Sequence, residues 1–189
     1  GTGNILYELI KEKQRLGADL EDICDTTWAS DKFQIPVHVT TLLTADPQAY
    51  GAPQRIFRSD VWDLSIDKLI PIFFPLDGEQ RDCELPVFNA IVSNLPFVRF
   101  EKKNRISTSR EKVESFLDLS NLELSKRSDA YGLIPFKLHS LLAPSGRLVI
   151  ITSNSWLGTE WGDQFRIELR RYFDLIAVIK SGTCRWFAD

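Results

Sequence analysis

The sequence predicts an α/β fold, with a mostly parallel sheet flanked by helices. Segments of helical periodicity alternate with short apolar, β-branched runs along the chain. Each apolar run ends in polar, Gly or Pro residues, where loops of a parallel sheet bind ligands. With 189 residues, of which 43% are hydrophobic, the chain can form one sizeable core. We therefore expect residues 1–189 to belong to one domain.

Helices are predicted where apolar residues recur at intervals of three or four. Such spacing occurs in residues 4–16, 131–142 and 161–173. Residues 143–146, Ala-Pro-Ser-Gly, are expected to break the second of these helices. The charged segment 102–127 has little strand pattern and is compatible with a helix or a mobile loop.

Strands are predicted where β-branched and apolar residues form compact runs: 37–43, 56–57, 87–92, 147–152 and 174–179. The first of these runs is followed by Asp46-Pro47, the second by Ser59-Asp60 and the third by Ser93-Asn94. These polar residues are therefore candidates for a ligand site at one edge of the sheet.

Composition limits the classes of partner and compartment. Lys and Arg number 23, Asp and Glu number 26, and the net charge is −3, so nucleic-acid binding would depend on local patches. Cys24, Cys83 and Cys184 are odd in number and lack metal-type spacing, which argues against a disulfide framework or a metal site. Without a secretory signal or a membrane-spanning apolar run, we expect a cytoplasmic protein with no membrane partner.

Asn94-Leu95-Pro96-Phe97 is the motif that says most about chemistry. The side-chain carbonyl of Asn94 and a neighbouring backbone carbonyl can accept both hydrogens of an exocyclic amino group. Phe97 can stack on a base extruded from a duplex. An ordinary turn after a strand, with Phe97 packed in the core, explains the motif equally well when it is judged alone.

A second candidate site combines a glycine turn with two aspartates. Gly1-Thr2-Gly3 precedes the first helix, and glycines allow the backbone to approach a ligand closely. Asp46 and Asp60 follow predicted strands, where carboxylates can accept hydrogen bonds from a nucleoside. Each aspartate alone is also typical of a helix cap or a turn.

In this order, the motifs resemble those of the adenine-specific DNA methylases of type I and type IIG restriction–modification systems. Gly1-Thr2-Gly3 is similar to the end of the family's D-P-x-x-G-T-G loop, Asp46-Pro47 to its acidic-proline step, and Asp60 to the aspartate that contacts the cofactor adenine. Ser93-Asn94-Leu95-Pro96-Phe97 resembles its N-P-P-Y/F loop. Residues 141–157, from Leu-Leu-Ala-Pro-Ser-Gly to Asn-Ser-Trp-Leu, resemble a further family segment.

The resemblance implies a Rossmann-like methyltransferase fold and transfer of a methyl group from S-adenosylmethionine to N6 of adenine in DNA. It implies that Gly1, Thr2, Gly3, Asp46 and Asp60 bind the cofactor. Asn94, Leu95, Pro96 and Phe97 would hold the target, with a specificity or restriction subunit as a partner. The family's first strand and target-recognition domain have no counterpart here, and the chain has no methionine, so we expect a fragment.

Two departures from the family bear on activity. Leu95 replaces the first proline of the target loop, and Thr44 stands where an acidic residue would bind the cofactor ribose. We expect Leu95→Pro to preorganise the loop and stabilise the protein by about 0.4–1 kcal/mol, provided that the backbone already has the proline conformation.

Other functions remain open. The ribosomal-RNA adenine dimethylases have an N-[LI]-P-[YF] loop, which Asn94-Leu95-Pro96-Phe97 matches fully, whereas Gly1-Thr2-Gly3 and the Asn154-Ser155-Trp156-Leu157 segment favour the DNA family. Methylation of a protein glutamine uses a similar loop, and nothing in the sequence selects it. A non-catalytic binding or scaffold subunit is the alternative from a different class.

Overall fold

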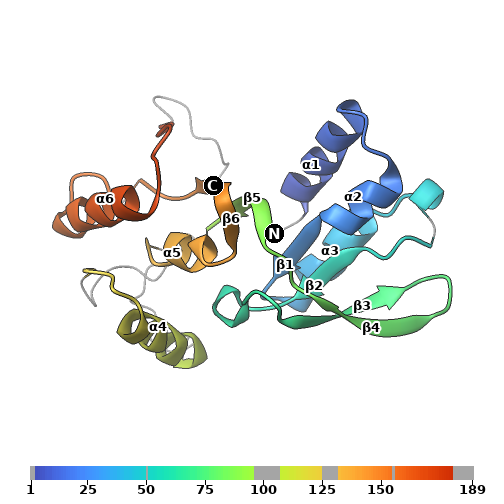
Figure 1. Ribbon diagram of the computed structural model, residues 1–189, viewed down its shortest axis with the longest axis horizontal. Helices are drawn as coiled ribbons and strands as arrows, with labels where there is room; N and C mark the ends of the chain where they lie inside the picture. The colour runs from blue at the N-terminus through green and yellow to red at the C-terminus, as the bar shows by residue number, and fades with distance from the viewer. Residues whose placement is uncertain (1–2, 50, 96–106, 125–131, 155, 181–189) are drawn as a thin grey trace. The chain divides into compact units, whose positions relative to one another are not determined.

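The protein has a mixed α/β structure with small parallel and antiparallel sheets flanked by helices (Figure 1). The predicted α/β class is therefore confirmed. The computed structural model describes residues 3–49, 51–95, 107–124, 132–154 and 156–180. The chain forms two compact units. Unit 1 comprises Gly1–Val92 and Ser140–Val149, and unit 2 comprises Ser93–His139 and Ile150–Asp189.

Unit 1 begins with two helices, α1 (Asn4–Arg15) and α2 (Leu20–Thr26). The helix predicted at residues 4–16 is confirmed. The ammonium of Lys13 donates to the hydroxyls of Thr26 and Thr27, at 2.8 and 2.7 Å. These bonds link the last turn of α1 to the end of α2, immediately before the first strand.

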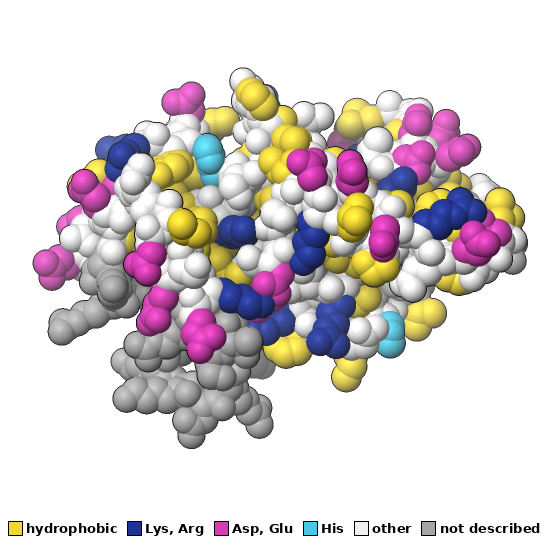
Figure 2. Space-filling view, turned by 60° about the horizontal axis from the view of Figure 1, so that its bottom comes forward, with side chains coloured by type: hydrophobic (Ala, Val, Ile, Leu, Met, Phe, Trp, Pro, Cys, Tyr) yellow, Lys and Arg dark blue, Asp and Glu magenta, His cyan; other side chains and the backbone are white. Residues whose placement is uncertain are grey.

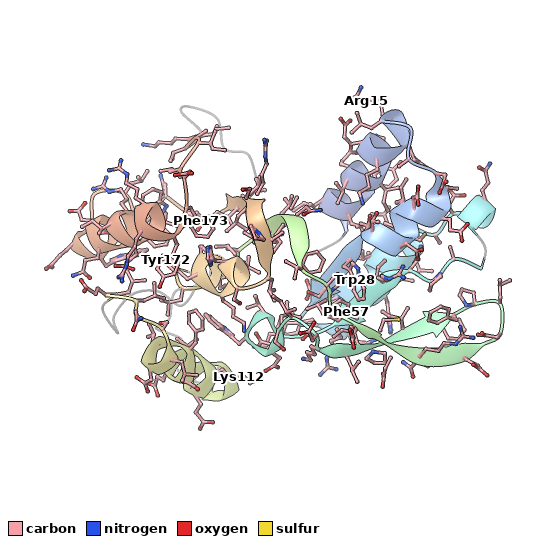
Figure 3. All side chains as sticks on the ribbon, viewed as in Figure 1. Arg15, Trp28, Phe57, Lys112, Tyr172 and Phe173 are labelled. Carbon is pink, nitrogen blue, oxygen red and sulfur yellow. The ribbon has the colours of Figure 1, made fainter. Side chains whose placement is uncertain are left out.

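A β–α–β segment follows: β1 (Trp28–Asp31), α3 (Gln34–Leu43) and β2 (Arg55–Arg58). The two strands are parallel and aligned from Trp28↔Arg55 to Asp31↔Arg58. The rings of Trp28 and Phe57 lie side by side, with centroids 6.2 Å apart (Figure 3). The strand predicted at 56–57 is thus confirmed, and β1 was not predicted.

The strand predicted at residues 37–43 is wrong, because these residues belong to α3. Val37 and Thr40 are buried at a spacing of three residues, which matches a helix that packs on β1 and β2. The hydroxyl of Thr41 donates to Val37 O at 2.9 Å, so this polar group is satisfied within the helix. β-branched residues only weakly favour strands, and packing decides here.

An antiparallel hairpin follows β2, made of β3 (Leu69–Phe74) and β4 (Glu79–Glu84). Ile70 and Ile72 alternate with exposed residues and are almost fully buried, as in a strand with one covered face. Between β2 and the hairpin lies the short 3-10 helix η2 (Val61–Asp63), and η1 (Pro47–Ala49) precedes β2.

The last strand pair comprises β5 (Phe88–Asn94) and β6 (Leu142–Ile151). Phe88 N–H donates to Leu141 O and Leu95 N–H to Ile151 O, both at 2.9 Å. Because both partners advance together along the chain, the strands are parallel. The strands predicted at 87–92 and 147–152 are confirmed, while residues 143–146 lie inside β6 rather than in a separate break.

Unit 2 contains helices α4 (Ser107–Leu119), α5 (Ile134–His139) and α6 (Glu160–Tyr172). The helix predicted at 161–173 is confirmed, and the one predicted at 131–142 is shorter. Rings of α5 and α6 pack together in this unit, with the centroid of Phe136 5.4 Å from that of Tyr172 and 6.0 Å from that of Phe165.

The strand predicted at residues 174–179 is not formed, because the structure gives residues 173–180 no regular secondary structure. Its apolar side chains are exposed, Ile176 by 84% and Ile179 by 78%. A strand needs a hydrogen-bonding neighbour, which an apolar pattern alone does not supply. None of the helices that the structure describes is long and apolar enough to cross a membrane.

Candidate functional site

Two aspartates lie at the carboxyl ends of the parallel strands β1 and β2. Asp31 is the last residue of β1, and Asp60 follows β2 and caps η2. Because neighbouring parallel strands end at the same edge of a sheet, the two carboxylates belong to one edge of unit 1. Ser59 N–H donates to Asp31 O at 3.0 Å, which ties the end of β2 to that of β1.

Both carboxylates accept a hydrogen bond from a backbone N–H, and Asp60 also forms an ion pair. Asp31 Oδ1 accepts a bond from Phe33 N–H at 2.8 Å, and Asp60 Oδ1 accepts one from Trp62 N–H at 3.3 Å. Asp60 Oδ2 also lies 2.8 Å from the Lys32 ammonium, and the Asp60 side chain is only 15% exposed. Acceptor oxygens in fixed positions at this edge suit the hydroxyl and amino donors of a nucleoside.

Asp31 was missed by sequence reasoning, and Asp46 was placed wrongly. Asp46 follows the helix α3 rather than a strand, and its Oδ1 accepts a bond from Gln48 N–H at 2.8 Å as a turn residue does. Thr44 caps the end of α3, with its hydroxyl on Thr40 O at 2.9 Å. The acidic residue at the end of the strand that precedes α3 is Asp31.

The glycine turn is described only at Gly3, because Gly1 and Thr2 lie outside the described residues. Gly3 precedes α1 with φ 83°, a left-handed conformation that favours glycine. A Cβ on Gly3 would lie 2.9 Å from both Cγ2 and Oγ1 of the buried Thr40. The start of α1 is therefore packed against α3, the helix that connects β1 with β2.

Asn94 and Leu95 lie at the end of β5. Asn94 is the last residue of the strand and is exposed, whereas the side chain of Leu95 is only 3% exposed. Leu95 N–H donates to Ile151 O on β6. Pro96 and Phe97, the other predicted residues of this loop, lie outside the described residues. Asn94 and Leu95 belong to unit 2, whereas Gly3, Asp31 and Asp60 belong to unit 1.

The segment after β6 has a structural role at the start of α6. Thr159 Oγ1 donates to Trp156 O at 3.1 Å and accepts a bond from Gly162 N–H at 3.3 Å. A Cβ on Gly162 would overlap Trp156 O, so a side chain does not fit there. The ring of Trp156 packs on Phe165, 5.5 Å between centroids. These contacts explain part of the 141–157 pattern without a ligand.

Metal ligands and a reactive thiol are the other features considered among the described residues. The described residues contain no group of three or more His, Cys, Asp or Glu side chains that could hold a metal ion. Burial raises the pKa of the half-buried Cys24, and the nearby Asp25 adds to this effect, so the thiol stays protonated at neutral pH. Acidic, basic and apolar side chains lie next to one another on the face shown in Figure 2.

A scan against protein-family models gives no match to the chain, and a search of curated proteins gives no significant match.

Proposed function

We propose that this chain binds S-adenosylmethionine at the carboxyl ends of β1 and β2, within a Rossmann-like fold. We propose further that it transfers the methyl group to N6 of adenine in DNA, as the methylase of a restriction–modification system. One observation carries the proposal: Asp31 is the last residue of β1, and Asp60 follows the end of the adjacent parallel strand β2. Ligands of open α/β sheets bind outside such strand ends.

The residues of unit 1 fit a nucleoside that carries an amino-acid tail. Ionised carboxylates only accept hydrogen bonds, and the donors of this ligand are the ribose hydroxyls, the adenine amino group and the ammonium of the amino-acid tail. We assign Asp31 to the ribose and Asp60 to the amino group. The backbone at Gly3, which carries no Cβ, would approach the tail. Gly3 lies beside Thr40, which is six residues after the start of α3. At 1.5 Å per residue, this places Thr40 about 9 Å along the helix axis from the end of α3 that follows β1.

The chemistry requires orientation more than reactive side chains. When bound, S-adenosylmethionine supplies an electrophilic methyl group on a sulfonium. Asn94, exposed at the end of β5, would accept a hydrogen bond from the adenine amino group and direct the nitrogen lone pair out of the ring system. Holding the two reactants in line provides much of the rate enhancement without a covalent intermediate.

Adenine in RNA is the second candidate, and Leu95 favours it. Its N–H donates to Ile151 O, a bond that a proline cannot make. Leucine at this position, as in the N-[LI]-P-[YF] pattern of the RNA enzymes, therefore fits the observed backbone better than the proline of the DNA pattern would. The glycine turn and the 141–157 segment favour DNA, so DNA remains the main proposal.

Calorimetry with S-adenosylhomocysteine tests the cofactor site through a pair of variants. Asp31→Asn should weaken binding about 10- to 100-fold, because it removes a charged acceptor. Asp46→Asn is the matched control and should leave the affinity unchanged. If wild-type protein does not bind the ligand, the chain is a scaffold and not a methyltransferase. If Asp46→Asn is the weaker binder, the assignment of Asp31 is wrong.

Transfer of a tritiated methyl group then separates the two substrates. We expect incorporation into adenine-containing DNA and much less into RNA of matched sequence. The opposite preference would establish the RNA alternative. Incorporation into neither, by a protein that binds the cofactor, would contradict the catalytic proposal once a target-recognition subunit is supplied.

A further inference from the structure

We propose that Lys32 is a positioning residue for the cofactor site, acting through its ion pair with Asp60. This inference rests on the proposed function. Lys32 directly follows Asp31 at the end of β1, and its ammonium lies 2.8 Å from Asp60 Oδ2 at the end of β2. The pair therefore joins the two strand ends that carry the proposed ligand acceptors.

Burial shows which partner depends on the other. The Asp60 side chain is 15% exposed, whereas that of Lys32 is 48% exposed. A largely buried carboxylate is costly to leave without an opposite charge, whereas a half-exposed ammonium is readily solvated. Lys32 thus supplies an opposite charge beside Asp60 Oδ2 and helps to fix the direction of that carboxylate.

The same ammonium offsets repulsion within the site. Asp31 and Asp60 place two carboxylates at adjacent strand ends, and like charges repel each other. The positive charge of Lys32 lies in the chain between β1 and α3 and contacts the carboxylate of Asp60. The ammonium therefore lies where it can reduce the repulsion between the two carboxylates.

The test measures S-adenosylhomocysteine binding, because this ligand has no net charge and its salt dependence reports on the protein. Lys32→Met should weaken binding about fivefold, and Lys32→Arg should restore most of it. In an Asp60→Asn background, Lys32→Met should have no further effect. Wild-type affinity should fall more between low and high salt than that of Lys32→Met, since a half-exposed pair is screened.

Lys11→Met is the matched control, because Lys11 forms a surface pair with Glu8 at 3.3 Å in the same unit. It should change neither affinity nor salt dependence. If Asp60→Asn weakens binding but Lys32→Met does not, Lys32 forms a surface ion pair only and this inference falls. An equal effect of Lys32→Met in the Asp60→Asn background also overturns it. If Asp31→Asn and Asp60→Asn both bind as wild type does, the proposed cofactor site itself is wrong.

Discussion

The strand ends of the two units hold their polar residues in different ways. In unit 1, the side chains of Asp31 and Asp60 each accept a hydrogen bond from a backbone N–H group, and Asp60 also pairs with Lys32. In unit 2, the backbone after Asn94 is fixed by the bond from Leu95 N–H to Ile151 O, while the Asn94 side chain is exposed. A preformed set of acceptors suits a resident cofactor, whereas an exposed amide suits a substrate that arrives and leaves.

The largest effect is expected for a variant of Asn94, the residue that we propose to bind the substrate. Asn94→Ala should reduce methyl transfer by about 10²- to 10³-fold, because one oriented acceptor is lost. Cofactor affinity should not change, since the acceptors of unit 1 remain. Asn89→Ala, on the same strand and also exposed, is the control and should retain activity. Equal transfer rates for Asn94→Ala and wild type would remove Asn94 from the reaction.

Leu95→Pro tests whether the backbone of unit 2 is as constrained as the structure indicates. The sequence alone predicts a small stabilisation, but the structure reverses the sign, because the N–H of Leu95 bonds to Ile151 O. The variant would lose this bond and leave the carbonyl of Ile151 without its partner, so its free energy of unfolding should be lower by about 1–3 kcal/mol. Urea denaturation measures this difference. Leu95→Ile retains the N–H and should cost less than about 1.5 kcal/mol; a stable Leu95→Pro would contradict the bond.

The apolar pattern alone located α1 and β5, and Asp60 was placed correctly after a strand. Packing covers little of these two elements, because Leu6 is the only buried residue of α1 and Val92 of β5 is 43% exposed. The pattern failed at residues 37–43, where β-branched residues form the helix α3, which packs on β1 and β2. That error placed Asp46 after a strand, whereas the acidic residue that ends a strand before α3 is Asp31.

The missed elements carried weak local signals. β1 has four residues, and its sequence Trp-Ala-Ser-Asp lacks a β-branched run. The signal that would have found Asp31 was Asp-Lys-Phe directly before a helical pattern, as at a strand-to-helix turn. For residues 174–179, the apolar pattern was clear, but the hydrogen-bonding partner of a strand cannot be read from one segment.

Gly3→Ala tests the packing of the glycine turn in unit 1. A positive φ costs a non-glycine residue about 1–2 kcal/mol, and the new Cβ would also meet Thr40 at 2.9 Å. Gly17→Ala is the control, since Gly17 has φ 92° and a Cβ added there would have no neighbouring atom within 4 Å. We expect Gly3→Ala to be the more destabilised variant in thermal unfolding, and Thr40→Ala to recover part of the difference. Equal losses would show that Thr40 does not contact Gly3.

The smallest expected effects compare helix caps in the two units. Asp19 Oδ1 accepts a bond from Asp22 N–H at 2.8 Å at the start of α2, and Thr159 Oγ1 accepts one from Gly162 N–H at 3.3 Å at the start of α6. Replacing either residue with Ala should cost about 1 kcal/mol. The loss at Asp19 should shrink with salt, because its charge also interacts with the helix dipole, whereas the loss at Thr159 should not.

Hydrogen–deuterium exchange with peptide resolution shows where each cap acts. If the units open independently, Asp19→Ala should accelerate exchange in α2 and leave α6 unchanged, and Thr159→Ala should do the reverse. Asp19→Asn separates the two contributions at α2, since it keeps an acceptor and removes the charge, so its loss should be a few tenths of a kcal/mol. Acceleration in both helices by either variant would mean that the units unfold together. The contrast between the strand ends of units 1 and 2 would then reflect local hydrogen bonding rather than a separate stability of each unit.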